Sequence, residues 1–286
     1  TGFKGAWLAL WLEHLGAEVS GIALPPANQP NLFTLARVQE CVQHYNIDIC
    51  DAEALVTKVR KVQPEIVLHL AAQALVRLSY QEPLATFATN VQGTANLLDA
   101  VRQTDGVRAI VAVTTDKVYE NLEHSFPYRE TDALGGHDPY SASKAACEIV
   151  IASYRAAFLN ADATAVASAR AGNVVGGGDW SDDRLVPDIV RAWSSGKPLQ
   201  IRRPGAIRPW QHVLESLAGY LVLAQALYKS PELAGAYNFG PNTQEAATVR
   251  TVVELARTAF GRGKTVWCND MEGPHESNWL ALEVAK

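Results

Sequence analysis

Tyr140 and Lys144 form the clearest chemical signal in this sequence, within Tyr140-Ser141-Ala142-Ser143-Lys144. Residues at positions i and i+4 project from one face of a helix, one turn apart. A free tyrosine has a pKa of about 10, too high for a base at neutral pH. A neighbouring ammonium and a cationic nicotinamide ring would both favour the phenolate and lower that pKa. The pair therefore predicts a general base for hydride transfer, with Lys144 also holding a ribose hydroxyl. An exposed helical Tyr/Lys pair is the alternative.

Two further polar clusters follow predicted strands. Thr114 to Lys117 ends an apolar strand, and Arg170 to Asn173 ends the next one. In a parallel sheet these ends share one edge, where such sheets bind ligands. A threonine hydroxyl can bind a sugar oxygen, Asp116 can give or take a proton, and Lys117 is a third titratable group. Core packing does not produce three polar clusters at strand ends, so we favour a catalytic site.

Helical and strand patterns alternate along most of the chain. Helices are predicted over residues 6–15, 52–62, 86–102 and 141–158, and short apolar strands over 18–24, 65–70, 109–114 and 164–170. This alternation predicts an α/β fold with a Rossmann-type doubly wound parallel sheet. After Gly176-Gly177-Gly178 the pattern changes, with helices over 184–194 and 214–228. We therefore expect a cofactor domain over 1–173, a smaller mixed α/β substrate domain over 174–286, and a ligand cleft between them.

The first residues resemble the second half of a glycine-rich phosphate turn. Gly2 would let backbone amides approach a pyrophosphate, Phe3 lies between them, and Gly5 would let the helix pack close to the sheet. A simple helix-start turn is the alternative. Because such a turn needs a strand before it, we expect the first strand to precede Thr1, and the C-terminus also to be truncated.

Other candidate cofactor ligands come from three loops. Asp48 can accept a hydrogen bond from an adenine amino group beside the backbone of Ile49; alternatively, Asp48 or Asp51 caps a helix. The small residues after the strand at 65–70 let the backbone lie against a flat ligand. Asn90 either ties loops together around the cofactor or caps a helix. The candidate residues from these strand-end and loop segments are Leu70, Ala71, Ala72, Gln73, Asn90, Thr114 and Arg170.

Charge and composition exclude several classes of protein. The chain has 286 residues and a net charge of -5, which argues against a nucleic-acid partner. No apolar run is long enough to span a membrane. The four cysteines lack metal-ligand spacing, so we expect no metal and free thiols in a reducing cytoplasm. Arginines near Trp and Pro suit a substrate pyrophosphate. Solvated surface arginines are the alternative for Arg202 and Arg203, and Arg208 is the better candidate.

Together these residues resemble the sugar-nucleotide 4,6-dehydratases of the extended short-chain dehydrogenase/reductase superfamily, and most closely the CDP-glucose branch. The Tyr-Lys pair is specific only to the superfamily, whereas the glycine-rich and Arg-Pro-Trp segments are more specific. The resemblance spans essentially the whole chain. The segments concerned are Thr1 to Gly5, His69 to Gln73 with Leu75 to Arg77, Thr115 to Asn121, Gly135 to Tyr140, Arg170 to Trp180 and Arg208 to Glu215.

The resemblance implies a redox-neutral dehydration with tightly held NAD. Tyr140 would take the proton of the hexose 4-hydroxyl while hydride leaves carbon 4. Water would then be lost across carbons 5 and 6, and hydride would return to carbon 6. Thr115 would bind the 4-oxygen and Asp116 would protonate the departing hydroxyl. The implied substrate-binding residues are Arg77, Asn173, Arg184, Leu185, Arg203, Arg208, His212 and His275.

Lys117 is an informative departure, because most 4,6-dehydratases have Glu at this position. A lysine base at carbon 5 must be neutral, and burial beside Lys144 and the nicotinamide would depress its pKa. The strand at 18–24 also ends without the acidic residue that usually selects NAD. The preference for NAD therefore rests on the resemblance, and some tolerance of NADP is expected.

The resemblance also implies deoxysugar biosynthesis for surface polysaccharides, a cytoplasmic location, and a homo-oligomer (dimer or tetramer) paired through the helices at 86–102 and 141–158. Two alternatives stay open. A sugar-nucleotide epimerase or simple dehydrogenase would share Tyr140 and Lys144 without needing Asp116 and Lys117 as an elimination pair. A cofactor-binding regulator without catalysis belongs to another class, and the intact catalytic set argues against it.

Overall fold

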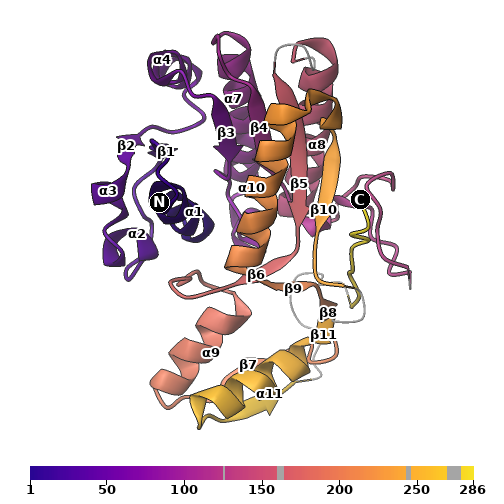
Figure 1. The fold of residues 1–286 in the computed structure, drawn as a ribbon. Helices are drawn as coiled ribbons and strands as arrows, with labels where there is room; N and C mark the ends of the chain where they lie inside the picture. Colours follow the sequence, from indigo (N-terminus) through magenta and orange to yellow (C-terminus); the bar gives the residue numbers. More distant parts are fainter. Residues whose placement is uncertain (125, 160–163, 243–245, 269–277) are drawn as a thin grey trace.

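The computed structural model describes residues 1–124, 126–159, 164–242, 246–268 and 278–286. A four-stranded parallel sheet forms its centre, in the order β10-β5-β4-β3 (Figure 1). A separate parallel pair, β1 with β2, lies nearer the N-terminus. The strands are β1 (Ser20–Ala23), β2 (Gln43–Asn46), β3 (Ile66–His69), β4 (Ala109–Val113), β5 (Ala165–Ala171) and β10 (Ala236–Phe239).

Helices cover both faces of this sheet. On one face, Val166 of β5 packs with α4 (Ala52–Val62), α7 (Gly93–Arg102) and α8 (Pro139–Ala157). On the other face, Ala165, Ala167 and Ala169 of the same strand pack with α1 (Phe3–His14) and α10 (Val213–Lys229). Burial on both faces explains why these strands are apolar at nearly every position. The Rossmann-type α/β prediction is confirmed, and the strands agree with their predicted positions to within about two residues.

The predicted single helix over 86–102 is instead a series of segments. They are α6 (Pro83–Phe87), a π-helical turn η1 (Ala88–Gln92) and α7 (Gly93–Arg102), with α5 (Val76–Gln81) just before them. Asn90 lies inside the π turn, fully buried, and its side chain bonds the loop at Gln73. A side chain held by tertiary hydrogen bonds is one way that a π turn is kept within a helix. Sequence periodicity does not register it.

A smaller unit lies below the sheet in Figure 1. Ile189, Trp193, Leu199, Ile201 and Val253 form its core. Its elements are β6 (Asn173–Val175), α9 (Leu185–Ser194), β7 (Leu199–Ile201), β8 (Ile207–Arg208), β9 (Trp210–His212), β11 (Ala247–Thr248), α11 (Val249–Phe260) and β12 (Thr265–Trp267). The short helices elsewhere are α2 (Leu32–Leu35), α3 (Val38–Cys41), and the 3-10 turns η2 (Asp116–Val118) and η3 (Pro231–Leu233).

The central sheet continues beyond residue 173. β10 pairs with β5, and α10 packs on β4 and β5, although both follow that residue in sequence. The division into a cofactor domain and a substrate domain at 173/174 stays a prediction. In the structure the chain passes between the central sheet and the smaller unit more than once. In the described ranges, no helix has both the length and the apolarity to cross a membrane. All four cysteines are free thiols, as expected.

Candidate active site

Tyr140 and Lys144 lie in the first turns of α8. Asp138 caps this helix by accepting a hydrogen bond from the Ser141 amide, and Pro139 takes the first helical position, where its missing N–H costs nothing. Both functional side chains are buried. The Lys144 ammonium donates to the Val113 carbonyl, 3.0 Å away at the end of β4. The predicted helix pair is therefore present, and the lysine is fixed to a strand end.

Burial, rather than a neighbouring cation, controls the Tyr140 phenol. Burial raises its pKa to about 12; a hydrogen bond with the Thr115 side chain lowers it, and the Asp116 charge raises it. The sequence predicted a pKa lowered by Lys144, but that ammonium is turned to Val113. Burial likewise lowers the pKa of Lys144. Desolvation is the largest effect on this phenol, and the lowering expected beside a bound cationic nicotinamide stays a prediction.

Thr115, Asp116 and Lys117 lie directly beyond β4 and contact one another. The Thr115 hydroxyl donates to Asp116 Oδ1 over 2.9 Å and also interacts with Tyr140. Asp116 is 1% exposed, and its Oδ2 has no hydrogen-bond partner within the described ranges. The structure thus places the strand-end cluster next to the α8 pair, with Thr115 in contact with both Asp116 and Tyr140. That placement agrees with the strand-end argument, while the roles of these residues stay predictions.

Lys117 lies further out than its predicted role requires. A third of its side chain (33%) is exposed, and its ammonium is 4.0 Å from Asp116 Oδ1. The hypothesis of a neutral base assumed full burial next to Lys144. The structure instead leaves Lys117 partly exposed, beside the carboxylate of Asp116.

Lys4 lies near Lys144 and Asp116, and the sequence did not predict it as a site residue. Its ammonium donates to Tyr220 Oη over 2.8 Å, and lies 4.9 Å from the centre of that ring. Burial lowers its pKa to about 7, with further lowering by the charges of Arg184 and Lys144, and Asp116 acts in the opposite direction. A cation in the first turn of a helix opposes the helix dipole. The unfavourable position of a lysine in the first turn of this helix is the sequence signal that could have identified Lys4 as a candidate.

Two of the arginines predicted to bind substrate form ion pairs, and one of them acts on Tyr140. Arg184, the N-cap residue of α9, is close enough to Tyr140 to lower its pKa, and it pairs with Asp179 over 3.3 Å. Arg77 of α5 pairs with Asp183 over 3.1 Å. Each arginine is thus paired with a carboxylate, and Arg184 is the one whose charge acts on Tyr140.

The predicted phosphate turn is only partly as expected. Gly2 is the N-cap residue of α1, and no atom lies within 4 Å of where its Cβ would be, which leaves room for an anion at the helix start. Phe3 packs among the side chains under α10. A Cβ at Gly5 would also meet nothing within 4 Å, and the close packing expected at Gly5 stays a prediction.

The predicted adenine loop is held by its own hydrogen bonds. Asp48 accepts from the Cys50 amide, while Asp51 is the residue that caps α4. Ile49 is buried in the core and its carbonyl accepts from Asn96. The capping alternative is therefore right for Asp51, and the adenine contact of Asp48 stays a prediction.

Asn90 joins neighbouring segments through its side chain, which agrees with the first of its two interpretations rather than with a helix cap. Its side chain exchanges two hydrogen bonds with the Gln73 backbone and donates to Ser143 of α8 over 2.8 Å. Leu70, Ala71 and Ala72 are the intermediate, half-buried residues just before Gln73. The Gln73 side chain itself bonds Leu75 and Thr86. Asn90 thus positions the loop at the end of β3 relative to the Tyr140 helix.

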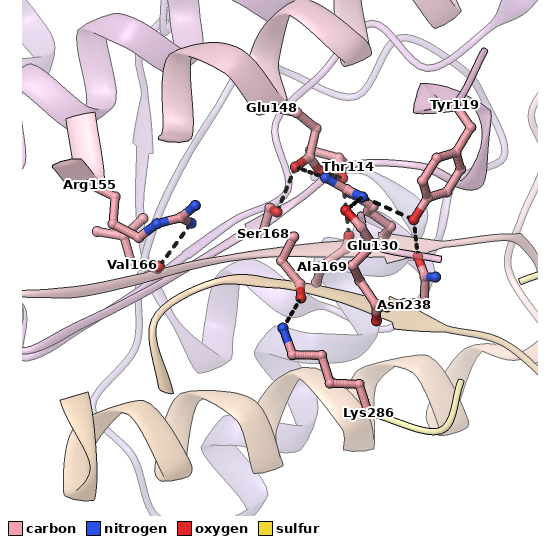
Figure 2. A network of polar contacts seen from close by, with 12 residues as sticks. Thr114, Tyr119, Glu130, Glu148, Arg155, Val166, Ser168, Ala169, Asn238 and Lys286 are labelled. Carbon is pink, nitrogen blue, oxygen red and sulfur yellow. Dashed lines mark hydrogen bonds and ion pairs between the residues drawn. The ribbon is translucent and has the colours of Figure 1, made fainter. Parts of the chain in front are cut away.

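Thr114 and Arg170, both predicted to bind the cofactor, use their side chains in a buried network. Figure 2 shows Thr114 and Ser168 directed at Glu148 of α8. Arg170 donates to the same carboxylate over 2.8 Å, and this pair raises its pKa against the effect of burial. The cofactor contacts of these two residues stay predictions. What their side chains do in the structure is join β4 and β5 to α8.

The remaining predicted substrate residues belong to the small unit. Asn173 begins β6, and no described residue bonds its buried Oδ1. Leu185 is the first residue of α9, and Arg208 lies on β8. Arg203 donates to Asn278 over 3.3 Å. His212 caps α10 with its Nδ1. His275 lies outside the described residues.

A Rossmann-type sheet, with Thr115 beyond the end of β4 and with Tyr140 and Lys144 in the first turns of α8, defines the class of fold and site. A model of the GDP-mannose 4,6 dehydratase family matches residues 1–278, and the chain belongs to that family.

Individual relatives agree with this assignment. A CDP-glucose 4,6-dehydratase of Salmonella typhimurium is 45% identical over 293 residues, covering 100% of this chain and 81% of the relative. A dTDP-glucose 4,6-dehydratase of Xanthomonas campestris is 30% identical, covering 85% and 70%. Among solved structures, a UDP-glucose 4-epimerase of Thermus thermophilus in complex with NAD has a TM-score of 0.83 and 26% identity, covering 99% and 88%.

Proposed function

We propose that this chain dehydrates CDP-D-glucose to CDP-4-dehydro-6-deoxy-D-glucose, with NAD as a cofactor that is regenerated in each turnover. The observation that supports it most is the contact of the buried Thr115 side chain with both Asp116 and Tyr140. The 45% identity to a CDP-glucose 4,6-dehydratase supports the choice of substrate. An epimerase would use the Tyr140 and Lys144 pair without needing the buried acid at Asp116.

The oxidation half of the reaction belongs to α8. Tyr140 would remove the proton of the 4-hydroxyl, and the Thr115 hydroxyl would bind the 4-oxygen beside it. Lys144 would hold a ribose hydroxyl of the cofactor and stabilise the phenolate when its ammonium leaves the Val113 carbonyl. Without such a cation, burial keeps the phenol protonated, with a pKa of about 12.

The elimination half belongs to the segment after β4. Asp116 Oδ2, which is buried and lacks a described hydrogen-bond partner, is the oxygen able to hold the proton delivered to the leaving 6-hydroxyl. Lys117 would take the proton from carbon 5, which the 4-ketone acidifies. Lys117 would pass that proton over 4.0 Å to Asp116, which has protonated the leaving 6-hydroxyl. A solvent proton would enter carbon 5 when hydride returns to carbon 6, and Tyr140 would release the 4-hydroxyl proton to solvent.

The residues at the strand ends fit a dinucleotide. The open space beside Gly2 at the start of α1 suits a pyrophosphate, and the buried Tyr140 and Lys144 provide hydroxyl and ammonium groups for a ribose. Asp48 and Ile49 would hold the adenine, with Leu70 to Gln73 beside it. When bound, NAD would supply the hydride acceptor for carbon 4 and the donor for carbon 6.

The substrate pyrophosphate would lie among cations of the small unit. Arg184 is the candidate closest to Tyr140, and Arg203 and Arg208 would follow it along the substrate. Guanidinium groups match phosphate oxygens in geometry and stay charged at neutral pH. Arg77, Asn173, Leu185 and His212 complete the set that we propose, with His275 beyond the described residues.

Incubation with CDP-glucose and NAD, without any added reductant, tests this function. The expected result is the alkaline absorbance of a 4-keto-6-deoxy product, and Tyr140→Phe serves as the inactive control. If CDP-, dTDP- and GDP-hexoses all fail to give the signal, the chain is not a 4,6-dehydratase. A galactose-configured product without loss of water would favour the epimerase.

We also propose a cytoplasmic homo-oligomer that supplies deoxysugars for surface polysaccharides. Leu84 and Phe87 of α6 and Ile149 of α8 are 84%, 39% and 62% exposed, and α6 and α8 contact each other. Apolar side chains gathered on adjacent helices favour association with a second copy. Ile149→Lys is expected to reduce the mass measured by light scattering, whereas Val222→Lys on α10 is the exposed control.

A further inference from the structure

A buried ion pair lies behind the active site, and the mechanism above does not use it. Glu148 is on α8, one turn beyond Lys144, and is 3% exposed; its partner Arg170 on β5 is 4% exposed. The carboxylate also accepts hydrogen bonds from Thr114 and Ser168. Burying two charges costs free energy that a compact apolar pair would avoid. Stability alone therefore does not explain the pair, and its contacts with neighbouring side chains indicate another role.

The second end of this network is a tyrosine hydroxyl. Arg170 Nη1 donates to Tyr119 Oη over 2.9 Å, and Tyr119 in turn donates to Asn238 of β10 over 2.6 Å (Figure 2). Tyr119 is 1% exposed, and burial raises its pKa to about 12, so it keeps the proton it donates. Its hydroxyl therefore connects the segment after β4 to two strands of the sheet.

Thr114 and Tyr119, the two residues bonded to this network, flank the elimination residues in sequence. Thr114 precedes Thr115, Asp116 and Lys117, and Tyr119 follows them. Hydrogen bonds from Gly135 to Val118 and from Glu120 to Ala133 join this stretch to another loop. The Thr114 and Tyr119 side chains instead join it to α8 and to the central strands. Since Val113, which accepts the Lys144 ammonium, comes just before Thr114, the network also borders the oxidation pair.

We propose that Glu148 and Arg170 are positioning residues that hold both ends of the segment Thr114 to Tyr119, and thereby fix Asp116 and Lys117 relative to Tyr140. The proposal rests on the proposed dehydration for its effect on catalysis, but the restraint itself is a property of the fold. Opening one end should disturb elimination more than oxidation, because Asp116 and Lys117 both lie in the segment, whereas Thr115 is its one oxidation residue and Tyr140 and Lys144 belong to a continuous helix.

Two variants open one end each and leave the ion pair intact. Tyr119→Phe removes the hydroxyl bonded to Arg170 and Asn238, and Thr114→Val removes the hydroxyl bonded to Glu148. Tyr128→Phe is the matched control. Tyr128 is 2% exposed and stacks on Tyr119 at 5.1 Å, but its hydroxyl bonds the nearby Asn121 and Leu122 rather than the sheet.

Hydrogen–deuterium exchange tests the restraint without requiring activity. Peptides covering residues 114–120 should exchange about tenfold faster in Tyr119→Phe and Thr114→Val than in Tyr128→Phe or the unaltered chain. Equal exchange in all four proteins would overturn the proposal. If one variant fails to fold, the other still opens its own end of the segment.

A borodeuteride quench during a single turnover tests the catalytic consequence. Reduction of the 4-keto hexose that has not yet lost water places deuterium at carbon 4 of a sugar that keeps its 6-hydroxyl. The trapped fraction should rise about tenfold in Tyr119→Phe and stay unchanged in Tyr128→Phe, since small displacements of catalytic groups have large effects on rate. A fraction that is equal in both variants would overturn the proposal. An unaltered chain that forms no product refutes the proposed function instead, and the exchange experiment then decides the restraint.

Discussion

The α8 pair and the segment after β4 lie next to each other, but different contacts position them. Tyr140 and Lys144 are related by the repeat of one helix, and a local cap at Asp138 starts that helix. Thr115 to Lys117 occupy an irregular stretch whose ends are tied to residues far away in sequence, such as Arg170 and Asn238. The spacing of Tyr140 and Lys144 follows from one helix, whereas the elimination residues depend on tertiary contacts at both ends of their segment. The two steps should therefore respond differently to substitution.

Tyr140→Phe should have the largest effect, because it removes the proposed base of the first step. The rate should fall by about 10² to 10⁴, the usual contribution of general acid–base catalysis. Deuterium in CDP-[4-²H]glucose should then stay at carbon 4 in the recovered substrate, as mass spectrometry can show. Substantial turnover by this variant would contradict the division of roles between the two regions.

Lys117→Met should separate the two steps. Without the proposed base, solvent deuterium should not enter at carbon 5, while oxidation at carbon 4 continues. Nuclear magnetic resonance of the sugar in deuterated water measures both outcomes. Lys58→Met is a suitable control, since Lys58 lies on α4 against the Tyr45 ring. Normal exchange at carbon 5 in Lys117→Met would remove Lys117 from the elimination.

Thr115→Val should change the pH dependence of the reaction. The Thr115 hydrogen bond lowers the Tyr140 pKa, so its loss should raise that pKa. Because the phenolate is the active form, activity rises with pH through this value, and the rising limb should move to higher pH in the variant. Thr115→Ser should restore the original limb. An unchanged limb would show that the hydroxyl does not act on the phenol.

His69 at the end of β3 offers a smaller test, on stability. Burial lowers its pKa to about 3 from the ordinary 6.5, with further lowering by Lys144. Between these values the unfolded chain binds a proton that the folded chain does not. Stability should therefore fall with decreasing pH from about 6.5 toward 3, by up to about 1.4 kcal/mol per pH unit.

Urea unfolding at two pH values in this window measures that slope. His69→Asn should remove it, whereas the exposed His14→Asn should leave it in place. If His69→Asn keeps the full slope, His69 is not the group responsible.

Sequence reasoning was most accurate where local pattern determines structure. α4 begins and ends at the predicted residues, and β4 differs by one, because their apolar spacing follows directly from burial. It failed where distant contacts decide. The hydrogen bonds of Asn90 to Gln73 and the ion pair of Arg170 with Glu148 join different elements, and the sequence pattern predicted neither contact. Lys4 was hidden between two glycines that suggested a phosphate turn.

Isotope tracing in CDP-[4-²H]glucose tests the central claim, that both regions act in one redox-neutral reaction, most directly. With NAD and no reductant, we expect a 4-keto-6-deoxy product with the deuterium at carbon 6 and a solvent hydrogen at carbon 5. Deuterium that stays at carbon 4 of an epimerised sugar, or a product oxidised without loss of water, would contradict it.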